Sequence, residues 1–192
     1  GGGEQRLFLP LPWELTEPVE IRAEVQSGAV AEIHRVTLLP LLQNGGFEHV
    51  GADGLPRGWQ YQNGHLAAMD TDRPAEGAAC LRLRGEPGVF LEAHQTMPVE
   101  QGITYEARCL MRRSGGNGRT VGPCVVLFLA TGGERYMQLQ PTGEGGKGEW
   151  REYKGRFTVT EDVRSVSLYL YNVDSECTAW YDGAFVGEAD AR

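Results

Sequence analysis

The sequence predicts an all-β fold, and three features of the chain support this prediction. Apolar and polar residues alternate in short runs, which is the pattern of strands that are buried on one face. The chain contains 27 Gly and 10 Pro, which is enough for a turn between most of these runs. No stretch keeps the spacing of three and four residues that marks an amphipathic helix. With 192 residues, the chain can bury a core without disulfide bonds.

The N-terminal segment predicts a β-hairpin. Residues 19–25 and 31–38 each alternate between apolar and polar side chains, with turn-forming residues between them, and Pro40 closes the segment. Two interpretations stay open, because this hairpin could be the tail of a preceding module or extra strands of the module that follows. We therefore divide the chain into residues 1–42, a module at residues 43–188 and a tail at residues 189–192.

Eight further strands are predicted within the module, separated by Gly-rich turns such as residues 114–118 and 131–133. This number of strands at this spacing is typical of a β-sandwich or a jelly roll. The predicted ranges are 79–84, 88–95, 103–112, 123–130, 134–140, 150–159, 164–171 and 178–186.

Charge and composition exclude several classes of partner. The net charge is −8 and the pI is about 5.1, whereas a nucleic-acid-binding protein carries a basic stripe, so we expect no nucleic-acid partner. No run of 18 apolar residues is present, so we expect no transmembrane helix and no membrane partner. The four cysteines form no C-x-x-C motif, which disfavours a zinc site. We prefer buried free thiols, with a disulfide bridge as the alternative.

Each enzyme motif that we considered is absent or incomplete, so we predict that the chain is not an enzyme. There is no G-x-S-x-G nucleophile motif. Residues 143–148 resemble a phosphate-binding loop, but Gly follows Lys147 where that loop has Ser or Thr. Residues 70–75 begin like a calcium loop and then lack its later ligands. A polysaccharide lyase or hydrolase built on a jelly roll is a less favoured alternative.

Short motifs along the module resemble a known family. Residues 44–48 read Asn-Gly-Gly-Phe-Glu, and residues 54–59 read Gly-Leu-Pro-Arg-Gly-Trp. Together they resemble the opening of the carbohydrate-binding modules of families 4, 9 and 22, which are galactose-binding-like jelly rolls. Further similar segments follow in the family's order, covering the chain from Gln43 to about Gly187. They are residues 76–83, residues 101–105, Trp150 with residues 157–159, and residues 180–182.

The resemblance implies a jelly-roll β-sandwich of two antiparallel sheets. It implies a non-catalytic module that binds a polysaccharide or oligosaccharide on a concave sheet face. It further implies a larger glycan-degrading parent, such as a glycoside hydrolase, an extracellular or cell-surface location, and neighbouring modules of the same polypeptide as further partners. The alternative is a structural or protein-interaction spacer of the same fold, since fold does not fix function.

The resemblance also implies a structural calcium ion. The family's ligands are the Glu of the opening motif and the Asp of the closing strand, which are Glu48 and Asp182 in this chain. Calcium binds six to eight oxygen atoms and can pin two distant parts of a chain together. Gly183 departs from the family, which often has a second acidic residue there. The other interpretation is that Glu48 and Asp182 are ordinary strand-end carboxylates.

Strand alternation selects the candidate carbohydrate-binding residues. Sugar recognition uses flat aromatic rings together with polar side chains, and alternate residues of a strand share a face. In residues 164–171, for example, the tyrosines lie opposite the apolar side chains. A solvated sheet face, in which tyrosine merely favours β structure, is the alternative. For Trp59 we favour a packing role over a place at the edge of the site. The predicted ligand-binding residues are Trp59, Gln95, Arg112, Tyr136, Gln138, Tyr169 and Tyr171.

Overall fold

The computed structural model describes residues 41–115, 118–143 and 148–189. The hairpin predicted at residues 19–38 therefore lies outside the described residues. The structure separates the chain into two units, Gly1–Leu38 and Leu39–Arg192, and the description below concerns the second. Within the described residues, no helix is long and apolar enough to cross a membrane.

Eleven strands and one short 3-10 helix make up the described part of the chain. All eight strands predicted in the module are confirmed, with ends that differ by a few residues. The additional elements β1, η1, β2 and β8 are each two to four residues long. The bounds are β1 Gln60–Gln62, η1 Gly64–Leu66, β2 Ala67–Asp70, β3 Cys80–Arg84, β4 Phe90–Met97, β5 Thr104–Arg113, β6 Gly118–Leu129, β7 Glu134–Gln138, β8 Gln140–Pro141, β9 Arg151–Thr158, β10 Val163–Ser175 and β11 Thr178–Glu188.

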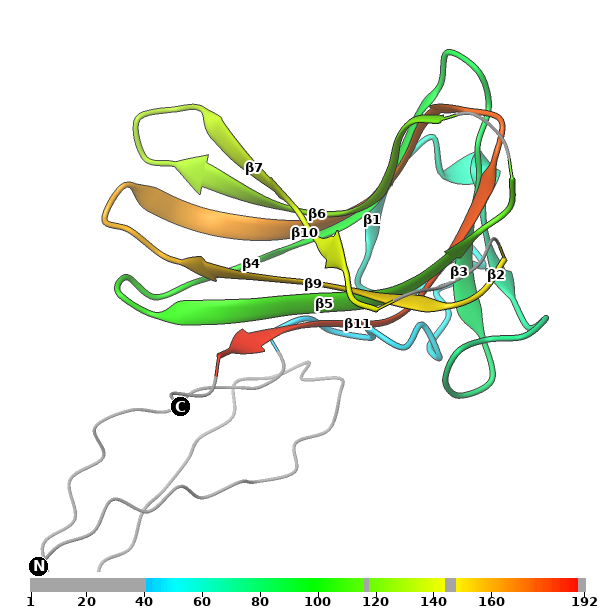
Figure 1. Ribbon diagram of the computed structural model, residues 1–192, viewed down its shortest axis with the longest axis horizontal. Coiled ribbons are helices and arrows are strands. Elements are labelled where there is room, and N and C mark those ends of the chain that lie inside the picture. Colours follow the sequence, from blue (N-terminus) through cyan, green and yellow to red (C-terminus); the bar gives the residue numbers. More distant parts are fainter. Residues whose placement is uncertain (1–40, 116–117, 144–147, 190–192) are drawn as a thin grey trace, which may run out of the picture. The chain divides into compact units, whose positions relative to one another are not determined.

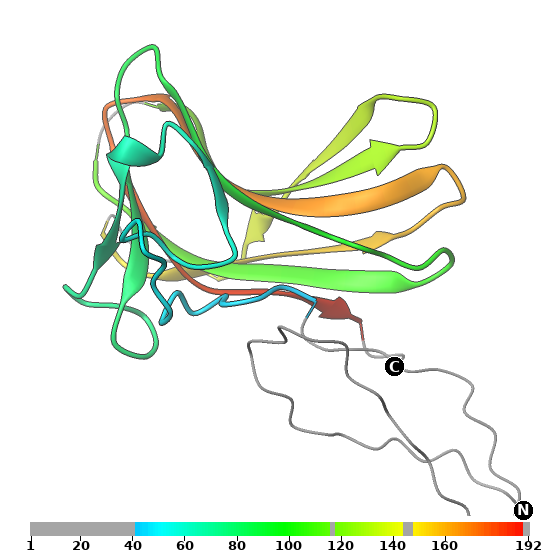
Figure 2. The same cartoon turned by 180° about the vertical axis from the view of Figure 1, so that it is seen from behind.

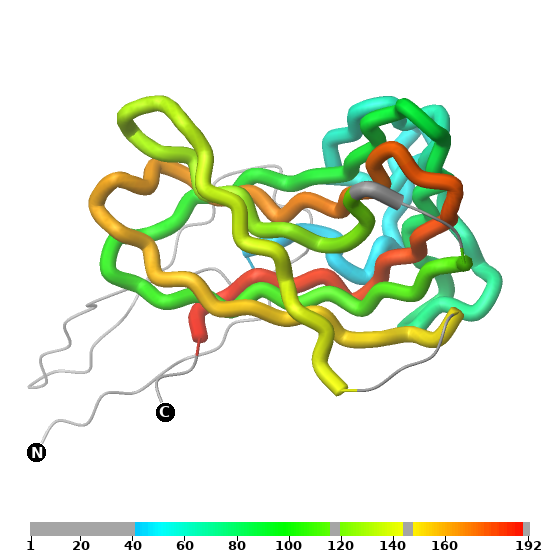
Figure 3. Tube along the Cα trace, turned by 45° about the horizontal axis from the view of Figure 1, so that its top comes forward, coloured from blue at the N-terminus to red at the C-terminus, as the bar shows by residue number. Residues whose placement is uncertain are grey.

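The strands form two antiparallel sheets that pack face to face, which confirms the predicted all-β sandwich. One sheet has the order β1-β4-β10-β6-β7, and the other has the order β2-β3-β11-β5-β9-β8. Figure 1 shows the two layers, and Figure 2 shows the same arrangement from behind. Between β7 and β8 the chain passes from one sheet to the other, which Figure 3 shows as a crossing segment.

The core lies between the sheets and follows from the alternation of side chains. In β10, Val166, Leu168 and Leu170 are fully buried and face the other sheet. The second sheet contributes the alternate residues of β5 and β11, among them Tyr105 and Tyr181. Buried apolar surface is the main force that holds the two sheets together. The four cysteines are buried and free, which confirms the preferred interpretation of the sequence.

The five-stranded sheet is curved, and the curvature gives its outer face a distinct shape. Strands β4, β10 and β6 bend along their length, so the outer face of the sheet is concave (Figure 1). We call this surface the concave face and define it by the outward-pointing residues of β1, β4, β10, β6 and β7. Because the strands bend along their length, the axis of this curvature runs across them, from the β1 edge to the β7 edge.

Candidate functional site

A row of outward-pointing residues crosses the concave face from one edge of the sheet to the other. The strand registers pair Gln60 with His94, His94 with Tyr169, Tyr169 with Cys124, and Cys124 with Gln138. We call these five residues the floor row. At a strand spacing of about 4.8 Å, the row spans roughly 19 Å. Apart from the buried thiol of Cys124, every member carries a polar group, so the row offers hydrogen-bonding groups on four of the five strands.

Three rings stand close together at the centre of the concave face. The centroids of Tyr169 and His94 lie 4.6 Å apart with 20° between their planes. Tyr169 and Tyr171 lie 5.2 Å apart with 14° between their planes. The faces of Tyr169 are thus engaged by two neighbouring rings. Tyr171 is only 7% exposed and Tyr169 is half-buried, so these tyrosines present edges and hydroxyl groups rather than open ring faces.

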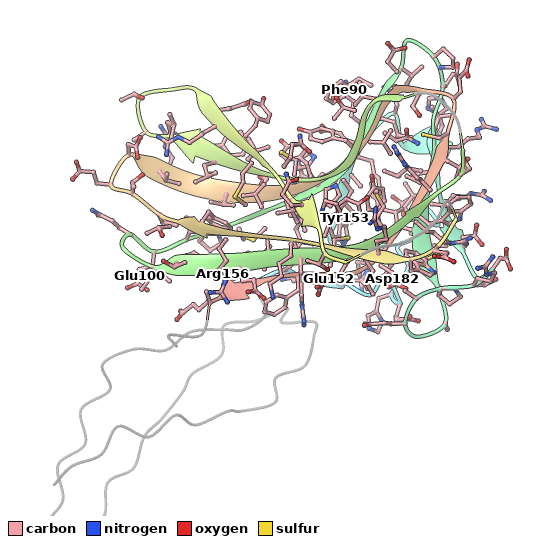
Figure 4. All side chains as sticks on the ribbon, viewed as in Figure 1. Phe90, Glu100, Glu152, Tyr153, Arg156 and Asp182 are labelled. Atoms are coloured by element: carbon pink, nitrogen blue, oxygen red, sulfur yellow. The ribbon has the colours of Figure 1, made fainter. Side chains whose placement is uncertain are left out.

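The open ring faces belong to two other residues, one at each side of the floor row. Tyr136 on β7 keeps 58% of its surface exposed, and Phe90 at the start of β4 keeps 42%. Phe90 contacts Tyr171 edge-on, with centroids 5.6 Å apart, so one aromatic group extends the other. Figure 4 shows Phe90 on the concave side of the sheet. Exposed aromatic faces of this kind can stack against the C–H groups of a sugar ring.

Polar side chains surround His94 within the floor row. The Nε2 atom of His94 lies 3.1 Å from Oε1 of Gln60, and its Nδ1 atom lies 3.1 Å from Oε1 of Glu92. Glu92 is only 7% exposed although it points to the outer face, because Tyr171 and His94 flank it in the sheet. A carboxylate at this place can accept hydrogen bonds from the hydroxyl groups of a ligand.

The tyrosine hydroxyl groups remain hydrogen-bond donors at neutral pH. Burial raises the pKa of Tyr169 and of Tyr171, and the nearby charge of Glu92 raises both further. The hydroxyl of Tyr136 donates to Oε2 of Glu134, and this bond raises the pKa of Tyr136 to about 12. Three protonated phenols therefore accompany two carboxylates on the concave face.

Four of the seven predicted ligand-binding residues lie on the concave face. Tyr169 and Tyr171 lie on β10, and Tyr136 and Gln138 lie on β7. The sequence analysis did not single out Gln60, Phe90, Glu92, His94 or Glu134, although they share this face. The signal for three of them was present, because Phe90, Glu92 and His94 alternate with the buried Leu91 and Ala93 in β4.

Trp59 and Gln95 lie away from the concave face. Trp59 is 7% exposed, packs against Phe47 with centroids 5.2 Å apart, and donates its Nε1 hydrogen to the carbonyl of Asn44. Gln95 points inward from β4, where its side-chain amide pairs with the backbone N–H and carbonyl of Gln43 at 2.6 and 3.0 Å. Both residues fix the chain segment that leads into the sandwich, so neither joins the other predicted residues on the concave face, and Trp59 has the packing role that the sequence analysis favoured.

Arg112 also lies away from the concave face, because it belongs to the other sheet. It lies on the outer face of β5, where its guanidinium sits 4.2 Å from the ring centroid of Trp180 and 5.4 Å from that of Trp150. Its Nη2 atom donates to the carbonyl of Asp72 at 2.6 Å, and the residue is only 6% exposed. The nearby Trp150 donates to the carbonyl of Arg73. We call Arg112, Trp150 and Trp180 the loop clamp, because they hold residues 70–74 against this sheet.

Glu48 and Asp182 brace the chain just after that loop. Asp182 is fully buried, and its Oδ2 atom accepts the backbone N–H groups of Ala75 and Glu76 at 2.8 and 2.9 Å. Oε1 of Glu48 accepts the N–H of Ala78 at 2.9 Å. Burial raises the pKa of Asp182 even so. The two predicted calcium ligands thus hold one short segment from two sides, and Figure 4 shows Asp182 on the side opposite Phe90.

The fit of calcium to these two carboxylates can be judged from their present partners. Calcium needs six to eight oxygen ligands. It would compete for the carboxylate oxygens with the backbone N–H groups that already donate hydrogen bonds to them. Within residues 41–115, 118–143 and 148–189, no three or more His, Cys, Asp or Glu side chains are grouped to hold a metal ion. Calcium binding by Glu48 and Asp182 stays a prediction.

Comparison with known proteins decides the family. A family model described as a carbohydrate binding domain matches residues 39–176. The chain belongs to this family. The match covers most of the sandwich and confirms the resemblance seen in the sequence. The chain is therefore a non-catalytic carbohydrate-binding module. No curated protein matches it in sequence.

Solved structures of other modules share the fold. The CBM22-1 xylan-binding domain of Paenibacillus barcinonensis Xyn10C is 15% identical, with a TM-score of 0.59, and the match covers 77% of this module's chain and 94% of that one. The C-terminal family 22 module of Clostridium thermocellum Xyn10B is 16% identical, with a TM-score of 0.56 and coverage of 78% and 96%. The CBM22-1-GH10 modules of the same organism's Xyn10B are 15% identical, with a TM-score of 0.52 and coverage of 69% and 26%.

Proposed function

We propose that the module binds an internal segment of a polysaccharide chain along the floor row of the concave face. The observation that carries this proposal is the row itself, which places polar groups from edge to edge of the sheet. Exposed rings flank it on both sides, Phe90 on β4 and Tyr136 on β7. Stacking on ring faces together with directed hydrogen bonds is the chemistry that sugars require.

The groups of the concave face divide the work of binding between them. Phe90 and Tyr136 supply stacking platforms, because their ring faces are open. Tyr169 and Tyr171 donate hydrogen bonds to ring and glycosidic oxygens, since their own faces pack against other rings. Gln60 and Gln138 lie at the two ends of the floor row, where they can form hydrogen bonds with the polysaccharide at the two edges of the sheet.

Xylan is the first ligand to test, and a glycan-degrading parent is the context we propose. Two of the similar structures are described as xylan-binding domains, and another joins such a module to a GH10 module with bound xylohexaose. By analogy we propose that this module belongs to a larger, secreted protein that acts on plant or microbial polysaccharides. Structural calcium, held by Glu48 and Asp182, remains part of this proposal.

A panel of soluble polysaccharides tests the proposal directly. Affinity electrophoresis and calorimetry with xylan, mixed-linkage glucan, galactan and mannan are expected to show binding to at least one polymer. Tyr136→Ala and Phe90→Ala are expected to weaken that binding. Phe185→Ala is the matched control, because this ring lies on the outer face of the other sheet, 4.8 Å from the guanidinium of Arg108. Equal loss of binding in the control variant would contradict the assignment of the concave face.

A further inference from the structure

A separate hollow opens beside the floor row, at the end of the sheet formed by the β6–β7 hairpin. Its volume is about 630 Å³, which is within the size range of small-molecule sites. Among the residues that line it are Phe128, Glu134, Tyr136, Arg164 and Ser165, together with the glycine turn of the hairpin. Of these, only Tyr136 belongs to the ligand-binding residues proposed above.

This hollow lies to one side of a main chain that follows the floor row. The register aligns Ser165 with Phe128, and Phe128 with Glu134, so these residues form a row of their own. Tyr169 lies four residues from Ser165 along β10, which corresponds to roughly 13 Å at about 3.3 Å per residue. A chain that follows the floor row across the strands therefore passes beside the hollow. A group that projects sideways from that chain, toward the β6–β7 hairpin, can reach the hollow.

The lining of the hollow indicates the chemistry of the group that enters. Phe128 and Tyr136 provide aromatic surface, and Ser165 provides a hydroxyl group. Glu134 offers a carboxylate, and Arg164 offers a guanidinium whose Nη2 atom is held by the carbonyl of Ala130 at 3.1 Å. One negative and one positive side chain balance each other, which favours an uncharged ligand that is rich in hydroxyl groups.

We propose that this hollow, which we call the branch site, binds a neutral sugar substituent of the polysaccharide main chain. The inference rests on the proposed function, because it assumes a main chain over the floor row. Tyr136 stands between the floor row and the branch site, so its ring contacts both the main chain and the branch. The module would then select branched polymers over linear polymers with the same backbone.

Matched oligosaccharides test the branch site with the module as it stands. For a xylan backbone, the pair is linear xylohexaose and a xylohexaose that carries a single arabinofuranosyl group on an internal unit. Calorimetry is expected to show about tenfold tighter binding of the branched compound. Ser165→Trp fills the hollow and is expected to remove this preference, while the affinity for the linear compound stays within about twofold. Ser165→Ala leaves the hollow open and removes only a hydroxyl group, so this variant is the control and is expected to keep most of the preference.

The outcomes separate failure of the branch site from failure of the proposed function. If no polysaccharide binds, the proposed function fails. If the linear compound binds and the branched compound binds no better, the branch site is wrong and the floor row stands. A preference that survives in folded Ser165→Trp protein also overturns the branch site. If Ser165→Trp does not fold, Phe128→Ala is tested instead, because it removes an aromatic side chain from the lining of the hollow. An undiminished preference in that variant also overturns the branch site.

Discussion

Replacing Tyr136 with alanine is expected to weaken polysaccharide binding about tenfold. The side chain keeps 58% of its surface exposed, which is roughly 115 Å² for a tyrosine of about 200 Å². A sugar that stacks on one face of the ring covers about half of that area. At about 25 cal/mol per Å², burial of roughly 60 Å² contributes about 1.5 kcal/mol, or a factor of about ten in Kd.

The same reasoning orders the neighbouring variants. Phe90 exposes 42% of its surface, so Phe90→Ala is expected to cost about 1 kcal/mol, or roughly fivefold in Kd. Tyr136→Phe keeps the ring and removes only the hydroxyl that bonds to Glu134, so most of the affinity is expected to remain. Titration calorimetry with the polysaccharide that the panel identifies gives each Kd, and thermal unfolding verifies that each variant is folded.

Either of two results would refute the ring-face reasoning. If Tyr136→Phe loses as much affinity as Tyr136→Ala, the hydroxyl and its bond to Glu134 carry the binding, and the exposed ring does not. If instead Tyr169→Ala is the only damaging variant and folds normally, the packed rings form the platform. The roles of stacked and exposed tyrosines would then have to be exchanged.

Three further predictions concern stability. Arg112→Ala removes the hydrogen bond to the Asp72 carbonyl and two ring contacts, so urea unfolding is expected to show a loss of about 2–4 kcal/mol while Kd is unchanged. Calcium at 100 times its Kd is expected to add about 2.7 kcal/mol to the free energy of unfolding. A melting temperature that responds neither to calcium nor to a chelator would show that the module binds no structural calcium. The double variant Glu48→Gln and Asp182→Asn is the control, and its melting temperature is expected not to respond to calcium. The pKa of Glu106 is lowered although burial opposes this, because Lys154 and Arg156 bind its carboxylate. Its contribution is therefore present above the ordinary glutamate pKa of about 4.3 and lost as pH falls below it, so Glu106→Gln is expected to shrink the difference in unfolding free energy between pH 7 and pH 3.5.

The strands of the module were readable from the sequence because alternation is a local property. Residues 164–171 show this clearly, since Val166, Leu168 and Leu170 face the core while Tyr169 and Tyr171 face outward, as predicted. Strand β1 was missed because it is three residues long and its two outer residues are glutamines, which give no hydrophobic signal. Short edge strands are defined by the partner they pair with, and that partner is distant in the sequence.

The candidate site was only partly readable, because alternation gives the face of a strand and not the sheet to which the strand belongs. Arg112 was correctly placed opposite Met111 and Cys109, on an outer face. The pairing of β5 with β11 and β9 puts that face on the other sheet, away from Tyr136 and Tyr169. Strand order depends on long-range contacts, which a single sequence does not display.

The two outer faces show how the same side-chain chemistry can serve either stability or binding. Trp150, Trp180 and Arg112 have the rings and the charged group that a ligand site uses, yet residues 70–74 cover them and take up their hydrogen bonds. On the five-stranded sheet no described segment lies over Tyr136 or Phe90, and their rings stay exposed. A ring becomes available for binding when the local chain leaves it uncovered. Access, rather than residue type, therefore distinguishes the concave face, where we propose that carbohydrate binds, from the loop clamp, whose side chains hold the chain itself.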